Sequence, residues 1–270
     1  MKKFVFGLAA IALIACQEKS APPEKVAEVK TYEIEDFFKN VNVGGGSFSE
    51  DESKILFHSD ATGIYNVYEI DLASKEKTQI TFSENASNYA IGYVPNSNEM
   101  LFSADGEGDE NYHIYLINDA KEIKDITPFE GATSRFGGYT ADKKHMYFLS
   151  NKRDAKFFDG YKMSLETWDY EMVYENNDGR NIDEVSDNEE YMTISQTITT
   201  SEDKYFLHNI LTKEEIEIST EQGSYSGSGF SQDNNHLYYI TDVGSEFSYL
   251  VDYNITTQER ETIFKTDWDI

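Results

Sequence analysis

A ten-residue pattern of polar turn and apolar strand recurs five times along the chain. Its copies begin at Phe48, Tyr93, Tyr139, Val185 and Phe230, at intervals of 45, 46, 46 and 45 residues. The fourth position is always Asp or Asn, which favour tight turns because their side chains bond the backbone two residues on. The strand after each turn has its last aligned position at Phe57, Phe102, Phe148, Ile194 and Tyr239. A strand that is apolar on both faces is expected between two layers.

A repeat of this length, with four short strands in each unit, is typical of a β-propeller. We predict an all-β fold of four-stranded antiparallel blades near residues 44–81, 88–127, 133–176, 180–220 and 225–266. Residues 267–270 lie where a sixth blade would begin. The five visible blades are therefore expected not to close, leaving apolar faces open to association. In the alternative, a closed five-bladed ring, residues 31–43 complete the last blade as a helix or strand.

The beginning of the chain has the features of a secretion signal. Lys2 and Lys3 precede an apolar run at residues 4–15, which is too short to span a bilayer. The ending LIAC at residues 13–16 resembles the lipobox of bacterial lipoproteins, in which the Cys is acylated. We predict a signal peptide at 1–15, lipidation of Cys16, and a flexible tether at 16–30. The alternative is an ordinary secretory peptide. The expected location is periplasmic or at the cell surface, anchored only through this lipid.

Charge and cysteine content restrict the partners of the remaining domain, residues 31–270. The chain has 23 basic and 50 acidic residues, a net charge of -27, which repels nucleic acid and anionic lipid. We therefore expect no nucleic-acid partner. Cys16 is the single cysteine, so the mature domain has no disulfide and no catalytic or metal-binding thiol. We expect no cofactor.

Two groups of residues are of types that can bind metal ions. The acidic segment DGEGDE at residues 105–110 offers oxygen ligands that could suit calcium, but it lacks the order of an EF-hand loop. We interpret it as a solvated hairpin turn. His145 and His236 occupy the same offset in two repeats, which indicates packing. The other three histidines lack zinc-ligand spacing, so no metal site is expected.

Several strings resemble a known family. They are TYEIEDFFKN at 31–40, the segment 44–72, SNKRDAKFFDGYKM at 150–163 and YYITDVGSEFSYL at 238–250. Together they resemble the N-terminal propeller of the prolyl oligopeptidase family of serine peptidases, over about residues 31–270. TolB-like periplasmic propellers share the turn phrase. The resemblance implies a ring of seven or eight blades and a separate α/β-hydrolase domain.

The catalytic parts of that family are absent from these 270 residues. Its nucleophile lies in a G-x-S-x-G elbow. The most similar string here, GSYSG at 223–227, has Tyr225 at its centre. No alternating helix and strand pattern predicts a hydrolase sheet. No catalytic residue can therefore be assigned.

Two polar pairs are candidate substrate contacts. Arg153 and Asp154 either order a long hairpin, the role we favour, or face the substrate chamber of a complete peptidase. Glu189 and Glu190 resemble the paired glutamates with which dipeptidyl-peptidase relatives hold a substrate amino terminus. They follow the turn residue Asn188, however, which indicates an exposed hairpin tip.

Two functions remain open. In the first, the chain is the substrate-gating propeller of a secreted serine peptidase, and its partners are peptide substrates and its own hydrolase domain. In the second, it is a free-standing TolB-like lipoprotein propeller that binds a partner protein. The coding sequence after Ile270 discriminates between them, because only the first predicts further blades and a nucleophile elbow.

Overall fold

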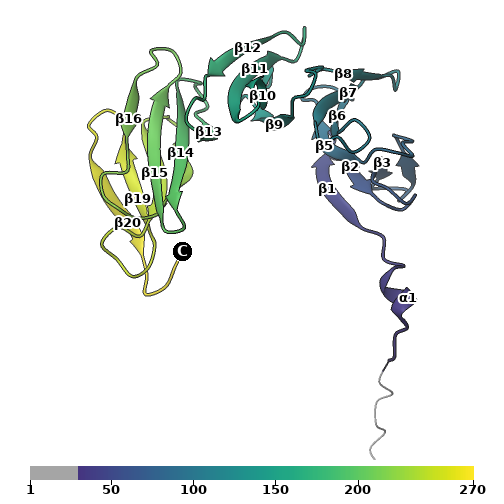
Figure 1. Ribbon diagram of the computed structural model, residues 1–270, viewed down its shortest axis with the longest axis horizontal. Helices are drawn as coiled ribbons and strands as arrows, with labels where there is room; N and C mark the ends of the chain where they lie inside the picture. The colour runs from purple at the N-terminus through teal and green to yellow at the C-terminus, as the bar shows by residue number, and fades with distance from the viewer. Residues whose placement is uncertain (1–29) are drawn as a thin grey trace, which may run out of the picture. The chain divides into compact units, whose positions relative to one another are not determined.

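The computed structural model describes residues 30–270, which contain twenty strands and one four-residue helix (Figure 1). The chain divides into two compact units, of which the first ends at Asn40 and the second is formed by residues 41–270. The first unit contains α1 (Ile34–Phe37). A capping box begins this helix, with the Glu33 amide donating to Asp36 Oδ2 at 3.1 Å. Part of the segment 31–43 is therefore helical.

The predicted leader at 1–15, the lipidation site Cys16 and all of the tether except Lys30 lie outside the described residues. Their assignment stays a prediction. Within residues 30–270, no helix has the length and apolar character needed to cross a membrane.

The second unit consists of five antiparallel sheets, each with four strands that pair in chain order. The first and second sheets contain β1 (Val43–Phe48), β2 (Lys54–Ser59), β3 (Asn66–Asp71), β4 (Lys77–Gln79), β5 (Asn88–Tyr93), β6 (Met100–Ala104), β7 (His113–Ile117) and β8 (Ile123–Asp125). The third and fourth contain β9 (Ser134–Tyr139), β10 (His145–Asp154), β11 (Phe157–Ser164), β12 (Tyr170–Tyr174), β13 (Asn181–Val185), β14 (Tyr191–Thr199), β15 (Glu202–Asn209) and β16 (Glu215–Glu217). The fifth contains β17 (Tyr225–Phe230), β18 (His236–Thr241), β19 (Tyr249–Asn254) and β20 (Arg260–Lys265). The prediction of an all-β fold with four-stranded blades is confirmed.

The recurring turn connects the first and second strands of each sheet. In the first sheet, Asp51 Oδ1 accepts hydrogen bonds from the Ser49 hydroxyl at 2.7 Å and from the Ser53 amide at 3.0 Å. The left-handed residue is the next one, Glu52, with φ 55°. The same shift occurs in the third, fourth and fifth sheets, at Lys143, Glu189 and Asn234, whereas in the second sheet Asn96 itself is left-handed. The Asp or Asn therefore caps the turn more often than it takes the strained conformation.

Each pair of consecutive sheets shares a hydrophobic core. Leu56 and Phe102 belong to the core between the first and second sheets, and Leu101 and Phe148 to the next. Separate cores join the third sheet to the fourth and the fourth to the fifth. A sheet that packs against a core on each side needs strands that are apolar on both faces, which explains the repeated apolar strands. Among residues 30–270, no hydrophobic cluster joins the first sheet to the fifth, and the sheets do not close.

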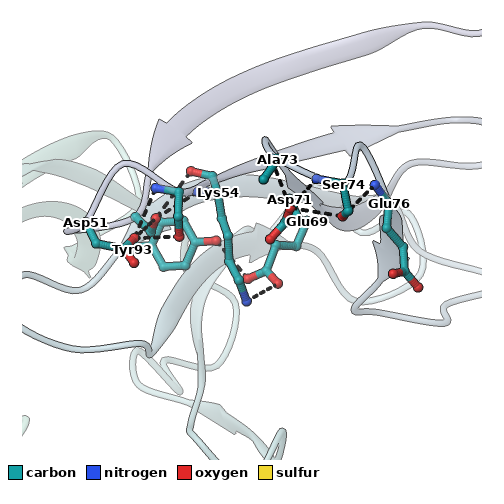
Figure 2. A network of polar contacts seen from close by, with 10 residues as sticks. Asp51, Lys54, Glu69, Asp71, Ala73, Ser74, Glu76 and Tyr93 are labelled. Carbon is teal, nitrogen blue, oxygen red and sulfur yellow. Dashed lines mark hydrogen bonds and ion pairs between the residues drawn. The ribbon is translucent and has the colours of Figure 1, made fainter.

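A polar contact accompanies the core between the first and second sheets (Figure 2). Tyr93, at the end of β5, donates its hydroxyl hydrogen to Glu69 Oε2 at 2.8 Å, and Lys54 Nζ lies 2.8 Å from Glu69 Oε1. Tyr93 is 7% exposed, so this bond is shielded from water. Tyr139 repeats the arrangement one sheet later, where its hydroxyl donates to the Tyr93 carbonyl at 3.0 Å. The first aromatic residue of the repeat thus attaches each of these two sheets to the preceding sheet.

Candidate binding site

A cavity of about 310 Å³ lies between the third and fourth sheets. Its lining comes from six strands, β9 to β14, and the apolar part includes Tyr139, Phe148, Leu149, Val173, Ile182, Val185 and Met192. Met192 is fully buried and belongs to the core between the third and fourth sheets, so the cavity reaches that core. Its volume is at the lower end of the range of small-molecule pockets, roughly 300 to 1,000 Å³. The cavity has room for a side chain or a similarly small group.

The local sequence explains how β13 comes so near the third sheet. Gly160 on β11 has no side chain, and a Cβ at that position would lie 2.5 Å from Ile182 Cδ1. Ile182 and Val185 point into the core shared with the third sheet. The β13 register is interrupted by a bulge between Ile182 and Glu184. A bulge changes the direction of the side chains beside it, and here the consecutive residues Asp183 and Glu184 both line the cavity.

Four carboxylates line the cavity: Asp183, Glu184, Asp187 and Glu189. Glu189 is engaged, since its Oε2 accepts the Tyr147 hydroxyl hydrogen at 2.9 Å and forms an ion pair with Lys162. Asp183 Oδ1 accepts a hydrogen bond from the Ser195 hydroxyl at 3.0 Å. Within residues 30–270, no Lys, Arg or His forms an ion pair with Asp183, Glu184 or Asp187. The rim therefore has uncompensated negative charge.

The environment makes two of these carboxylates, Asp183 and Glu184, harder to ionise. Burial raises the pKa of Asp183 to about 6, against the lowering effect of the Ser195 hydrogen bond. Burial also raises the pKa of Glu184, and Asp187 adds to that effect. Both residues are exposed to solvent at the rim, so water still reaches their carboxylates and moderates the effect of the surrounding protein on the pKa. A cation at the rim would stabilise the charged form of both groups.

The sequence-predicted residues Arg153 and Asp154 lie at the end of β10, away from the lining of this cavity. The Arg153 guanidinium makes two hydrogen bonds of 2.8 Å to Asp159, which is fully buried, and one to the Asn176 carbonyl at 2.5 Å. Asp159 also accepts the Asn176 amide at 2.8 Å. Asp154 Oδ1 accepts the Lys156 amide at 2.9 Å within the hairpin. These contacts suit a structural role, and substrate contact by Arg153 or Asp154 stays a prediction.

The two residues predicted at the hairpin tip, Glu189 and Glu190, have different surroundings in the structure. Glu189 is left-handed, with φ 58°, and lies on the cavity rim. Glu190 instead lies beside Asn209, whose side-chain amide donates to it at 3.4 Å. Sequence reasoning missed Asp183 and Glu184. A signal for them exists, because β13 reads NIDEV where the first strands of the other sheets contain paired or alternating glycines, or, in β5, apolar residues and one glycine.

The acidic hairpin and two of the histidines, His113 and His236, are satisfied by local partners. In the acidic hairpin, Asp109 Oδ1 accepts the amide hydrogens of Gly106 at 2.9 Å and Asn111 at 3.0 Å, as expected of a self-capped turn. His113 pairs with Asp125 at 2.7 Å, and His236 with Asp252 at 2.5 Å. Within the described part of the chain, no group of three or more His, Cys, Asp or Glu residues is arranged to hold a metal ion.

No protein-family model and no curated protein sequence matches this chain. Solved structures do. TolB from Acinetobacter baumannii is 20% identical with a TM-score of 0.50, over 81% of this chain and 53% of TolB. An oligogalacturonate lyase in complex with manganese is 15% identical with a TM-score of 0.59, over 83% of this chain and 66% of the lyase.

A prolyl endopeptidase is 10% identical with a TM-score of 0.61, and the match covers 83% of this chain and 35% of the peptidase. The chain thus spans about half the length of TolB and a third of the peptidase. The neighbours include both families that the sequence strings resemble, TolB-like propellers and the propellers of prolyl oligopeptidases. At these identities the likeness shows the fold, and that fold is a β-propeller.

Proposed function

We propose that this chain is a non-catalytic propeller that binds polypeptide, and that it gates access of peptides to the active site of a secreted serine peptidase. The observation that carries the proposal is the cavity between the third and fourth sheets, which combines an apolar floor with a charged rim. Binding pockets typically have this composition, a mainly apolar wall with a few polar groups that orient the ligand. The likeness to prolyl endopeptidase structures supports the finer assignment.

The chemistry of the proposed peptidase would come from a separate domain. The 270 residues contain no G-x-S-x-G elbow. In this proposal the hydrolase domain cleaves the substrate, and the propeller selects substrates by their size and side chains. Its own residues would bind and orient the peptide. The purified propeller is therefore expected not to cleave chromogenic dipeptides.

The peptidase assignment is tested on the native protein. An antibody raised against residues 44–266 should detect, in cells of the source organism, a protein well above the 30.9 kDa of this chain. A serine-directed fluorophosphonate should label that protein. A native band near 31 kDa that fluorophosphonate does not label would contradict gating of a linked hydrolase.

The second candidate is a free-standing TolB-like module that binds a partner protein. The putative TolB from Agrobacterium tumefaciens favours it, since the chain covers 80% of that protein at a TM-score of 0.51. Both candidates require polypeptide binding, which an array of twelve-residue peptides covering all side-chain classes tests directly. Absence of binding to every peptide would contradict both.

Secretion and anchoring form a separate proposal that rests on the sequence at residues 13–16. A palmitate analogue should label the wild-type protein and not the Cys16→Ser variant. Equal labelling of the two proteins would contradict the lipid anchor.

A further inference from the structure

The cavity between the third and fourth sheets has an apolar wall and an acidic rim, and this combination indicates the kind of ligand that fits it. Resting on the proposed peptide-binding function, we propose that this cavity binds the basic side chain of a polypeptide, a lysine or an arginine. The aliphatic stem lies against Leu149, Val173 and Ile182, and the cationic head lies at the rim beside Asp183 and Glu184. Long basic side chains suit such a site because they combine an apolar stem with a charged end.

The size of the cavity favours one side chain over a larger ligand. At about 310 Å³, it is at the lower limit of pockets that enclose drug-sized molecules. Its lining includes the fully buried Met192, which belongs to the core between the third and fourth sheets. A peptide backbone would therefore remain at the opening while one side chain enters.

The charge of the rim selects a cation. Lys162 is the basic residue beside the cavity, and it is already paired with Glu189, which also accepts the Tyr147 hydroxyl hydrogen. Asp183 and Glu184 thus face a ligand without a protein cation. An apolar side chain would remove water from these carboxylates without replacing its hydrogen bonds, which costs free energy. An organic cation restores them with charge-assisted hydrogen bonds.

A divalent metal ion fits the cavity less well than an organic cation. Calcium takes six to eight oxygen ligands, and the described residues contain no group of three acidic or other metal-ligating side chains so arranged. The opposite wall is also aromatic and aliphatic, with Tyr139 and Leu149 in the lining. Such a wall suits a hydrocarbon stem.

Proton linkage follows from the same geometry. Because burial raises the pKa of Asp183 to about 6, this group is partly neutral near pH 6 and charged above it. A cation binds the charged form better, so affinity should fall as pH decreases through about 6. The ionisable groups that face Asp183 or line the cavity are all acids or phenols except Lys162: Glu184, Asp187, Glu189, Asp203, Tyr139, Tyr147, Tyr161 and Tyr205.

Two matched peptides test the proposal on the full chain. Ac-Ala-Ala-Lys-Ala-Ala-NH2 and its norleucine analogue share the aliphatic stem and differ in the charge at its end. Ligand-observed NMR at pH 7.5 should show the lysine peptide binding at least about tenfold more tightly, as expected for a hydrogen bond to a charged group. Its affinity should fall at pH 5.

Variants locate the site. Asp183→Asn should weaken lysine-peptide binding about tenfold and remove the pH dependence near 6, because the titrating group is gone. Asp119→Asn makes the same change at an exposed turn outside the cavity and should have no effect. Val185→Phe fills the cavity and keeps all four rim carboxylates, so it should abolish the preference for lysine. Near-UV circular dichroism confirms that each variant is folded.

The outcomes separate the inference from the function on which it rests. Equal affinity for the lysine and norleucine peptides would overturn the basic-side-chain assignment and leave polypeptide binding intact. The same conclusion follows if Asp119→Asn weakens binding as much as Asp183→Asn does, because the effect is then general electrostatics. Binding of neither peptide, together with a negative twelve-residue array, would overturn both proposals.

Discussion

Adding one methyl group at Gly227 should destabilise the interface between the fourth and fifth sheets. A Cβ on Gly227, in β17, would lie 2.4 Å from Tyr205 Oη. The Tyr205 ring is fully buried and cannot move aside without disturbing the core that contains it. Overpacking of this kind costs about 1 to 3 kcal/mol. Replacing Gly by Ala also reduces the conformational entropy of the unfolded chain, which stabilises the folded protein by about 0.4 to 1 kcal/mol. The expected net loss for Gly227→Ala is about 1 to 2 kcal/mol.

The partner substitution makes this reasoning specific. Within residues 30–270 the Tyr205 hydroxyl has no hydrogen-bond partner, so Tyr205→Phe should be neutral or slightly stabilising. In the double variant the methyl group occupies the space of the missing oxygen, and most of the loss should be recovered. Gly46→Ala is the control, because a Cβ there meets no atom within 4 Å.

Urea unfolding measures the effect. With a slope of roughly 2 to 3 kcal/mol per M, a loss of about 1 to 2 kcal/mol should lower the Gly227→Ala midpoint by about 0.3 to 1 M. If the Gly227→Ala variant is as stable as the wild type, the packing argument is refuted. An equal loss in Gly227→Ala and in the double variant would refute the assignment of the clash to the Tyr205 hydroxyl.

Three other predictions concern the turns, the long hairpin and the open sheets. The Ser231 hydroxyl, with Asn235, lowers the pKa of Asp233 to about 2, so its contribution to stability is present above about pH 4 and lost as pH falls towards 2. Asp233→Asn should flatten that part of the urea-midpoint profile, and an unchanged profile would contradict this. Arg153→Met should lower the melting temperature without changing lysine-peptide affinity, whereas lost binding at unchanged stability would favour substrate contact. Light scattering of residues 31–270 should show association through the unpaired end sheets, and a compact monomer would contradict it.

The repeat could be predicted from sequence because every blade uses the same local rules. The order of residues along the chain directly shows the polar turn residues, the period of 45 or 46 and the strands that are apolar on both faces. The sequence does not choose between helix and strand at Ile34–Phe37, since four residues carry too little periodicity. It also does not specify which turn residue is left-handed, because the Asp side chain caps the neighbouring backbone and the left-handed residue is then the next one.

The candidate site could not be predicted from sequence because it depends on contacts between sheets. Gly160 and Ile182 are neighbours only because β11 and β13 pack together, and no local pattern specifies that approach. Asp183 and Glu184 look like two more acids among 50. Their raised pKa values come from the protein that surrounds the β13 bulge. Arg153 is a candidate because of the polar string in which it lies. The string does not show that Asp159, six residues away, is the buried carboxylate to which Arg153 binds.

Hydrogen–deuterium exchange tests the cavity as the peptide site most directly. With the lysine peptide at millimolar concentration, exchange should slow at residues 182–187 of β13 and its turn and at 137–140 of β9. The fifth sheet, 225–265, should be unaffected. The norleucine peptide should have little effect at the same concentration. Unchanged exchange at 182–187 in the presence of bound lysine peptide, or protection confined to another sheet, would contradict the account.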